Sequence, residues 1–366
     1  MGNNMKVALV GRVAEHVELF DGQTVKTRNL YELLKDIHNV ESVMLVDTCE
    51  YKKHIIRVLI QSIIALQKCD MIILCVAING RRFFFPFFYY LNKFFKKDIY
   101  HSLIGGSLAN NIEQHPRWKE YVNSFKINWV ESHELVEDLK SLGVNNGAYL
   151  PNFKKINAIK DVEITPYVRY PYEFCTFSRV QEKKGITDAI EAINAINQDA
   201  GKILAKLDIY GPVDEDFKFS FNKYLMQYQY CVRYMGCIDA DKSVETVRNY
   251  YMLLFPTRYY NEGIPGTIID ALAAGVPVIA RRWHFCDEIL ANNVNGLVYE
   301  FEESESLVKT IRFAIEHPDE IFEMKFKCIQ KAKEYMYNTV LEQVTDTLRG
   351  CYKEKINEGI TGYSDT

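Results

Sequence analysis

The stretch of sequence that decides the fold is FPTRYYNEGIPGTIIDALAAGVPVIA, from Phe255 to Ala280. A short apolar run is followed by a glycine-rich loop, by a segment whose apolar residues have helical spacing, and by a second apolar run. This order predicts strand, loop, helix and strand, which is one β-α-β unit of a parallel sheet.

Two acidic residues make this unit a candidate ligand site. Glu262 lies just before the expected helix and Asp270 lies two turns along it. Eight residues at ~100° each bring both carboxylates to one side of the helix, roughly 12 Å apart along its axis. That separation suits two hydroxyl groups of one extended ligand and is too long for acid–base work on one bond. The alternative is that Glu262 only caps the helix and Asp270 is a solvated helix residue.

The same alternation of short apolar runs and amphipathic stretches continues along the whole chain. It predicts two α/β halves of similar length joined near residue 160, because residues 153–171 have weak periodicity and contain Pro166 and Pro171. The first half is expected to have strands at 7–10, 42–46, 71–78, 98–100, 127–130 and 148–150. The second half is expected to have strands at 174–177, 207–210, 232–235, 252–255, 276–280 and 297–299.

Composition limits the class of protein. The chain has 366 residues, of which 48% are hydrophobic and 25% charged, and its formal net charge is −4. These values are typical of a soluble globular protein of two domains, and the negative balance argues against a dedicated nucleic-acid binder. The nine cysteines include no Cys-x-x-Cys pair, the first six residues lack the apolar core of a secretion signal, and no apolar run approaches a membrane span. We therefore expect a cytoplasmic protein.

The fingerprints of several enzyme classes are missing from the sequence. It contains no Gly-x-x-x-x-Gly-Lys-Ser/Thr, no Gly-x-Gly-x-x-Gly after the first strand and no Gly-x-Ser-x-Gly, which argues against P-loop enzymes, nicotinamide dehydrogenases and common hydrolases. The segment FSRVQEKKG at 177–185 places Arg179 and Lys184 at a strand-to-helix junction. Cations there can hold a phosphate against backbone N–H groups, and the alternative is a solvated charge cluster.

An aromatic and basic segment, RRFFFPFFYYLNKFFKK at 81–97, stands out in the first half. Helical spacing predicts a stripe that faces the core, and a second set of rings lies off it among five Lys and Arg residues. Aromatic rings beside cations suit an anionic membrane surface, so core packing and peripheral membrane contact both remain open. The stripe consists of Phe83, Phe84, Phe87, Phe88, Leu91, Phe94 and Phe95. The second set consists of Phe85, Tyr89 and Tyr90 beside Arg81, Arg82, Lys93, Lys96 and Lys97.

Several short motifs follow one another in the second half at fitting spacing. In these motifs the chain resembles retaining glycosyltransferases of the GT-B fold, of the large family 4 type, and the first half matches more loosely. The motifs are Arg179…Lys184-Gly185, Ile209-Tyr210-Gly211, Tyr234-Met235-Gly236, the helix with Glu262 and Asp270, AAGVPV at 273–278, and Asn295-Gly296-Leu297-Val298.

The resemblance implies an α/β fold with two Rossmann-like α/β/α domains that face a central cleft. Residues 1–165 would form the acceptor-side domain and residues 166–340 the domain that binds a nucleotide sugar. Residues 341–366 would form a C-terminal helix that crosses back to the first domain.

The resemblance also assigns roles in the second half. Arg179 and Lys184 would hold the diphosphate and offset the charge on the leaving group, and Glu262 would contact the donor sugar. Asp270, where the family usually has Glu, would accept hydrogen bonds from the ribose hydroxyls. The loop and first helical residues that would line the donor are Gly263, Ile264, Pro265, Gly266 and Thr267.

In the first half, Gly22 falls where the family places a glycine beside the donor phosphate, although the family normally has two adjacent glycines there. His101, which follows an expected strand, is the candidate for a histidine near the reacting sugar. The alternative for His101 is a structural hydrogen bond. Gly105-Gly106-Ser107 would line the acceptor side or form only a turn.

Two acidic strings, Asp214-Glu215-Asp216 and Asp239-Ala240-Asp241, are spaced as in metal sites for nucleotide sugars. Both follow expected strands and precede helices, where acidic residues favour the helix dipole. We interpret them as capping residues and expect no metal, because a GT-B-like cleft neutralises phosphate with Arg and Lys.

The implied activity is a retaining, metal-independent transfer of a hexosyl or N-acetylhexosaminyl unit, without a cofactor. The donor is a nucleotide sugar, a UDP-sugar being favoured over GDP-mannose, and the acceptor is a glycan or a lipid-linked glycan of surface polysaccharide synthesis. No nucleophile emerges, which fits the front-face displacement favoured for this family. The alternatives are a nucleotide-sugar epimerase or hydrolase of the same fold, and a catalytically silent scaffold in a glycan assembly complex.

Overall fold

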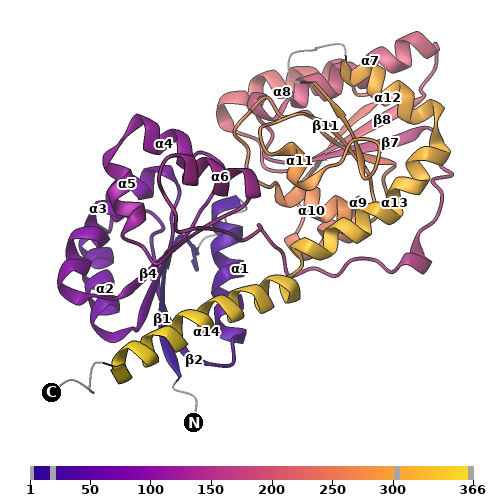
Figure 1. Cartoon of the computed structure of the whole chain (residues 1–366). Helices are drawn as coiled ribbons and strands as arrows, with labels where there is room; N and C mark the ends of the chain where they lie inside the picture. The colour runs from indigo at the N-terminus through magenta and orange to yellow at the C-terminus, as the bar shows by residue number, and fades with distance from the viewer. Residues whose placement is uncertain (1–3, 17–21, 301–305, 362–366) are drawn as a thin grey trace. The chain divides into compact units, whose positions relative to one another are not determined.

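The computed structural model describes residues 4–16, 22–300 and 306–361, and the side chains of these residues up to 350, Asp161 excepted. The chain forms two compact units. Unit 1 consists of Met1–Lys155 and Glu334–Thr366, and unit 2 of Ile156–Lys333. Each unit is built on one parallel sheet of six strands, with helices on both faces of the sheet (Figure 1).

The sheet of unit 1 has the strand order β2-β1-β3-β4-β5-β6. Its strands are β1 (Met5–Gly11), β2 (Val40–Asp47), β3 (Met71–Cys75), β4 (Asp98–Ser102), β5 (Ile127–Val130) and β6 (Gly147–Tyr149). Its helices are α1 (Gly22–Asp36), α2 (Ile55–Lys68), α3 (Ile78–Phe95), α4 (Leu108–Gln114), α5 (Arg117–Asn123), α6 (His133–Ser141) and α14 (Tyr337–Thr361).

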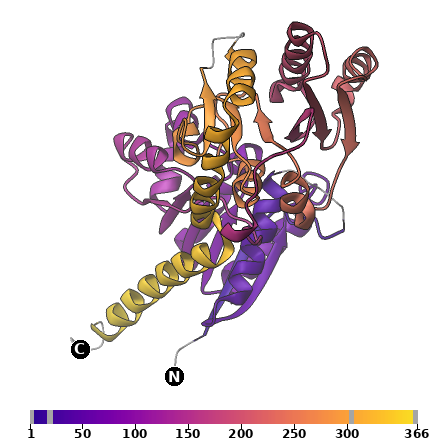
Figure 2. The ribbon, with the colours of Figure 1, turned by 90° about the vertical axis from the view of Figure 1, so that its right-hand side faces the viewer.

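The C-terminal helix α14 completes the core of unit 1. Val340, Val344 and Leu348 are spaced by four residues, so they share one face of the helix, and all three are fully buried in the same cluster as β1. The Tyr337 hydroxyl donates a 2.6 Å hydrogen bond to the Asp36 carboxylate at the end of α1. Figures 1 and 2 both show α14, in yellow, lying along the indigo elements of unit 1.

The sheet of unit 2 has the order β12-β11-β10-β7-β8-β9. Its strands are β7 (Tyr172–Phe177), β8 (Ala205–Tyr210), β9 (Val232–Gly236), β10 (Met252–Phe255), β11 (Val278–Arg281) and β12 (Gly296–Tyr299). Its helices are α7 (Ile186–Ala200), α8 (Glu215–Gln227), α9 (Ser243–Val247), α10 (Gly266–Ala273), α11 (Cys286–Ile289), α12 (Ser306–Glu316) and α13 (Pro318–Ala332). Short 3-10 turns are η1 (Asp161–Glu163), η2 (Glu182–Lys184), η3 (Ala240–Lys242) and η4 (Lys333–Tyr335).

Helix α7 shows how unit 2 builds its core. Ile186, Ile190, Ile193 and Ile196 recur every three or four residues, so they form one apolar face, and each is at most 3% exposed. Burying an isoleucine side chain stabilises the fold by about 2 kcal/mol. The helix ends at Gly201, whose φ of +62° favours glycine.

The strand predictions are confirmed for β5 and β10 with the same bounds, and the other ten strands lie within a few residues of their predicted positions. Three shifts matter for the site. Gly22, which the sequence pattern places in the loop after the first strand, is the first residue of α1. Strand β4 extends to Ser102, so His101 lies inside the strand and not after it. Strand β3 ends at Cys75, and Ile78 begins α3.

The aromatic segment 81–97 forms most of α3, but its predicted core stripe is only partly correct. Phe84 and Phe88 are buried as predicted, whereas Phe94 is 83% exposed because it lies in the last turn of the helix. Phe85, placed off the stripe, is fully buried against the rings of Trp118 and Phe125. Packing against α5 and the segment after it therefore buries a side of α3 that helical spacing alone assigns to solvent.

Arg81 is also buried, with 1% of its surface exposed, so it is not available to a membrane surface. Among the helices of the described residues, none is both long and apolar enough to cross a membrane.

Candidate active site

The sheet of unit 2 has a switch point between two neighbouring strands. From β7 the chain proceeds to β8 and β9 on one side, and it then returns to β10 on the other side of β7. Because β7 and β10 are parallel, the loops that follow them leave the same edge of the sheet. In open α/β sheets, ligands bind at such a point. The loop after β7 contains Arg179 and Lys184, and the loop after β10 contains Glu262.

Lys184 and Glu262 meet at this switch point. The Lys184 Nζ and the Glu262 Oε1 form an ion pair, with 20% and 15% of the two side chains exposed. The Thr257 hydroxyl donates a 3.4 Å hydrogen bond to the same carboxylate oxygen. The pair is therefore held from both loops and still reaches solvent, so an anionic or hydroxylated ligand has access to both partners.

Two opposing influences act on the Lys184 ammonium. Burial, and then the nearby Arg179 guanidinium, lower the pKa of Lys184 to about 8. The adjacent Glu262 carboxylate acts in the other direction, because it favours the charged form. Lys184 therefore keeps its proton at neutral pH and loses it in mildly alkaline solution.

The two loops are locked together by close backbone contact. Gly185 has a φ of +67°, and a Cβ placed on it would lie 1.9 Å from the carbonyl oxygen of Pro256. Next to it, the Arg258 backbone N–H donates a 2.8 Å hydrogen bond to the carbonyl of Lys183. Only glycine fits at position 185, which explains why Lys184 is followed by this residue.

A cluster of charged side chains holds the loops after β7 and β10 in place. We call it the Asp188 clamp, and it consists of Asp188, Glu182, Arg258 and Arg281. The Asp188 carboxylate in the first turn of α7 accepts hydrogen bonds from the Arg258 guanidinium and, at 2.7 Å, from Arg281 at the end of β11. Arg258 also pairs with Glu182 at 3.1 Å. The clamp thus joins three neighbouring strand ends around Lys184. Sequence reasoning missed it, and the only local signal is that Asp188 follows Lys184 by four residues.

Arg179 lies where the loop after β7 passes β8. A Cβ on Gly211, whose φ is +127°, would lie 1.9 Å from the Ser178 carbonyl oxygen, so the loops after β7 and β8 are in direct contact. The Arg179 Nη1 is 2.9 Å from the Asp214 Oδ1, and 46% of the arginine side chain is exposed. Arg179 therefore has an acidic partner that an anionic ligand could displace.

The predicted geometry of the Glu262 and Asp270 carboxylates is wrong. Helix α10 begins at Gly266, four residues after Glu262, so the helical spacing of eight residues does not apply. Asp270 is also not a solvated residue, since it is only 4% exposed. A turn at Tyr260 and Asn261 directly precedes Glu262, whose carboxylate pairs with Lys184.

The residues between Glu262 and α10 are held by the interior of unit 2. The Gly263 carbonyl accepts a 3.2 Å hydrogen bond from the Trp283 indole, and Ile264 is 3% exposed. Pro265 is the N-cap residue of α10, and Gly266 is its first residue. The Thr267 hydroxyl is buried and has no hydrogen-bond partner among the described residues. An unpaired buried hydroxyl beside a helix N-terminus can serve a ligand.

The capping prediction for the two acidic strings is only partly correct. Asp214 and Asp239 are the N-cap residues of α8 and η3, but neither side chain makes a capping hydrogen bond. Asp214 pairs with Arg179 instead, and Asp239 pairs with Lys242 at 3.3 Å. Over the described part of the chain, no three His, Cys, Asp or Glu side chains gather in a group that could hold a metal ion.

The predicted residues of the first half lie in unit 1. Gly22 is exposed at the start of α1. Gly105 has a φ of +78° and lies with Gly106 and Ser107 in the loop between β4 and α4. The structure brings Arg179, Lys184 and Glu262 together within unit 2, and Gly22 and His101 belong to the other unit.

His101 is fully buried in β4. Its ring lies 4.9 Å from that of Phe85, and its Nδ1 is 3.3 Å from the amide oxygen of Asn128. Burial, and then the charge of Arg81, lower the pKa of His101 well below its usual range, so the imidazole is neutral. The Nδ1 contact is that of the structural alternative, whereas Nε2 is buried and has no hydrogen-bond partner among the described residues. A position of His101 near the reacting sugar stays a prediction.

Comparison with known proteins finds a family resemblance in the same half of the chain. Residues 164–335 match the family model of glycosyl transferases group 1. This match lies almost wholly within unit 2 and covers just under half of the chain. The amylovoran biosynthesis glycosyltransferase AmsK of Erwinia amylovora is 24% identical over 140 residues, which are 37% of this chain and 34% of AmsK. The match thus spans about a third of that relative's length.

Solved structures resemble nearly the whole chain. Anabaena HepE in complex with UDP has a TM-score of 0.74 at 13% identity, covering 94% of this chain and 100% of HepE. Sucrose-phosphate synthase from Thermosynechococcus elongatus has a TM-score of 0.75 at 13% identity, covering 96% and 100%. The predicted fold, α/β of the GT-B type with two Rossmann-like halves, is confirmed. Together with the match to the group 1 model, this fold supports a glycosyltransferase.

Proposed function

We propose that this chain is a retaining glycosyltransferase that transfers a hexosyl or N-acetylhexosaminyl unit from a UDP-sugar to a glycan or glycolipid acceptor. The observation that carries the proposal is the accessible Lys184–Glu262 pair at the switch point of unit 2, with Arg179 beside it. Two cations and one carboxylate are the side chains that a diphosphate linked to a sugar requires.

Binding of the donor exchanges partners within this site. The diphosphate takes the place of Asp214 on Arg179 and of Glu262 on Lys184, since a phosphate oxygen is a stronger acceptor with more charge. Glu262, released from Lys184, then accepts hydrogen bonds from hydroxyl groups of the donor sugar. Two protein cations thereby compensate the diphosphate charge, and we propose that transfer needs no metal ion and no cofactor.

In the transfer step, the bond between the sugar C1 and the phosphate oxygen breaks, and a bond between C1 and the acceptor oxygen forms on the same face. The acceptor proton passes to the leaving diphosphate. Arg179 and Lys184 stabilise the charge that develops on that leaving group, which is electrostatic catalysis by groups positioned in advance.

The choice of UDP and of a glycan acceptor draws on the similar proteins. HepE has been solved with UDP and with UDP-glucose. AmsK is named for amylovoran biosynthesis, and WaaB, a lipopolysaccharide outer core galactosyltransferase, has a TM-score of 0.68 at 16% identity and covers 94% of this chain. A role in the synthesis of a surface polysaccharide or glycolipid is consistent with these names.

The first experiment is calorimetric titration of the purified chain with UDP and with GDP in the presence of EDTA. We expect UDP to bind with micromolar affinity and GDP to bind more weakly. Arg179→Ala should weaken UDP binding at least tenfold. The matched control is Arg312→Ala, because Arg312 is similarly exposed and also pairs with a carboxylate, that of Asp199.

Failure of both nucleotides to bind would exclude the donor site and favour the scaffold alternative. UDP binding together with release of free sugar from a UDP-hexose, unaffected by any glycan acceptor, would instead identify the hydrolase alternative. Glu262→Ala separates donor contact from folding, since sugar transfer should be lost while the unfolding temperature changes little.

A further inference from the structure

Positive charge is concentrated in one part of unit 1. Residues 51–97 contain nine Lys or Arg and a single acidic residue, Asp70, although the whole chain has a net charge of −4. This segment comprises α2 and α3, and neither helix contains an Asp or Glu. Such separation of charge produces a local positive potential that the net charge conceals.

Helix α2 carries apolar side chains on two sides. Its inner side contains Val58 and Leu66, which are buried against the sheet. On the outer side Ile56 and Ile60, four residues apart and therefore on one face, are 71% and 53% exposed. Arg57 lies between them in the sequence and is exposed as well. A soluble surface helix normally has polar residues on its outer side.

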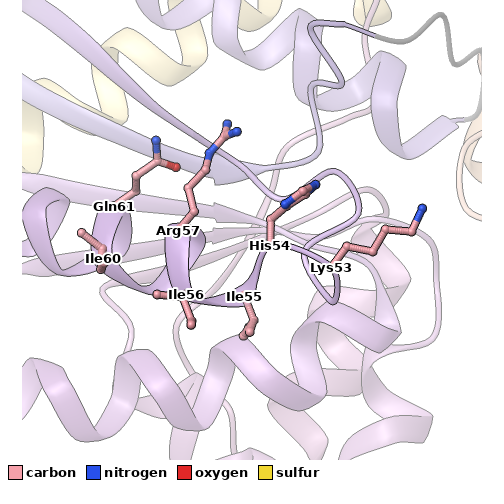
Figure 3. A pocket seen from close by; sticks show the side chains of 7 residues that line it. All are labelled: Lys53, His54, Ile55, Ile56, Arg57, Ile60 and Gln61. Carbon is pink, nitrogen blue, oxygen red and sulfur yellow. The ribbon is translucent and has the colours of Figure 1, made fainter.

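The exposed residues Ile56, Arg57 and Ile60 line a hollow at the start of α2. It has a volume of about 570 Å³, and Figure 3 shows that its lining side chains come from the turn before α2 and from its first two turns. The lining combines three isoleucines with cations, and the carboxylate nearest to it in sequence, Glu50, pairs with Lys53 and leaves the charge of Arg57 to the surface. The lining residues are Lys53, His54, Ile55, Ile56, Arg57, Ile60 and Gln61.

Helix α3 contacts α2 and also carries exposed apolar and basic side chains. The ring of Tyr51, just before α2, packs on Phe84 of α3 at a centroid distance of 5.6 Å. Toward the end of α3, Tyr90 and Phe94 are exposed, as are Lys93 and Lys96. Both helices thus present apolar groups beside cations.

We propose that the outer face of α2, centred on Ile56, Arg57 and Ile60, docks this protein on an anionic lipid surface. The isoleucines enter the boundary between headgroups and acyl chains, and the cations of α2 and α3 attract the anionic headgroups. Because no helix among the described residues can span a bilayer, the contact lies on the surface. An acidic protein would satisfy the cations, but the isoleucines also need an apolar environment directly beside the anionic groups, which the boundary between headgroups and acyl chains provides.

The inference goes beyond the proposed donor chemistry and does not rest on it. Each Lys or Arg near an anionic bilayer contributes about 1 kcal/mol, and this contribution is screened by salt. Membrane binding should therefore require anionic lipid, decrease with ionic strength and depend on the isoleucines.

The test is co-flotation of the full chain with vesicles of phosphatidylcholine, with and without phosphatidylglycerol, without nucleotide. We expect binding only to the anionic vesicles. Ile56→Ser combined with Ile60→Ser should weaken it about tenfold or more. The matched control is Phe219→Ser with Met226→Ser in α8 of unit 2, since these side chains are also apolar and are 85% and 71% exposed.

A second pair of variants tests the charge. Arg57→Glu should weaken vesicle binding about tenfold, whereas Lys223→Glu in α8 should have no effect. Absence of binding to anionic vesicles, equal binding to neutral vesicles, or equal loss in the α8 controls would each overturn the proposal. Titration of UDP on the same samples measures the donor site and not vesicle binding, so failure of the donor site is distinguishable from failure of the docking face.

Discussion

Each unit has a lysine–glutamate pair at the edge of its sheet where the strands end, and the two pairs differ in access to water. In unit 1 the Lys26 Nζ is 2.5 Å from the Glu131 Oε1 and 2.6 Å from the Leu103 carbonyl oxygen. The Lys26 and Glu131 side chains are 4% and 7% exposed, against 20% and 15% for Lys184 and Glu262 in unit 2.

The difference shows how one topology produces two kinds of charge pair. Lys26 has two fixed acceptors and little contact with water. A ligand that took the place of Glu131 on Lys26 would leave the Glu131 carboxylate in the interior without its cation. Lys184 pairs with one carboxylate, and part of its side chain is exposed to solvent. A diphosphate can therefore replace that carboxylate at a small cost in free energy. We infer that the first pair stabilises the fold and the second binds the ligand.

The largest effect should come from breaking the buried pair. Glu131→Ala leaves the Lys26 ammonium buried without its carboxylate, which should lower the free energy of unfolding of unit 1 by about 3–5 kcal/mol. Denaturant unfolding measures this loss, and Glu131→Gln, which retains an acceptor oxygen, should recover part of it. A loss below about 1 kcal/mol would show that water reaches this pair and would remove the contrast between the units.

The opposite result is expected for the accessible pair. Lys184→Met should raise the Kd for UDP about a hundredfold, because a charge-assisted contact with phosphate is lost, while stability changes by less than about 1 kcal/mol. Calorimetry and denaturant unfolding on the same samples give both values. If stability fell instead and UDP affinity did not, Lys184 would be a structural residue like Lys26.

Removing the Asp188 clamp should have an intermediate effect on the ligand. Arg258→Met releases Asp188 and Glu182 behind Lys184, so the two loops lose their fixed positions, and the Kd for UDP should rise about tenfold. Arg282→Met is the control, because the Arg282 side chain pairs with Asp287 and Glu300. No hydrogen bond or ion pair is found between that side chain and those of the clamp in the described structure. Equal effects of the two variants would argue against a positioning role.

The smallest effect concerns pH. Because the pKa of free Lys184 is lowered to about 8, and bound diphosphate favours the charged form, UDP affinity should be constant below pH 8. Above pH 8 it should fall by up to about tenfold per pH unit. Lys184→Arg keeps its proton throughout and should flatten the profile between pH 7 and 9.5. A wild-type profile as flat as that of the variant would contradict the assignment.

Much of unit 2 could be predicted because its local and tertiary signals agree. Met252–Phe255 is an apolar run that ends before Pro256, and it forms β10 with those bounds. Arg179, Lys184 and Glu262 could be selected because strand ends of a parallel sheet converge at one edge. The apolar runs locate the strands in the sequence. The order of the strands in the sheet then determines which residues lie at that edge.

Other features depend on contacts that no local pattern contains. Asp188 meets Arg281 across 93 residues of sequence, and the contact follows from the position of β11 beside β10. Phe85 is buried because α5 covers it, and Phe94 is exposed because the helix ends there. The packing of a neighbouring element decides the environment of Phe85, and the end of the helix decides that of Phe94, so the spacing along α3 predicts neither.

The return of the chain to unit 1 at Glu334 determines when each unit can finish folding during synthesis. All of unit 2, Ile156–Lys333, leaves the ribosome before α14 does. Until then the cluster around β1 lacks Val340, Val344 and Leu348 and exposes the apolar surface that they cover. The unit made first is therefore completed last, and truncation before residue 340 should leave unit 2 folded beside a unit 1 that aggregates.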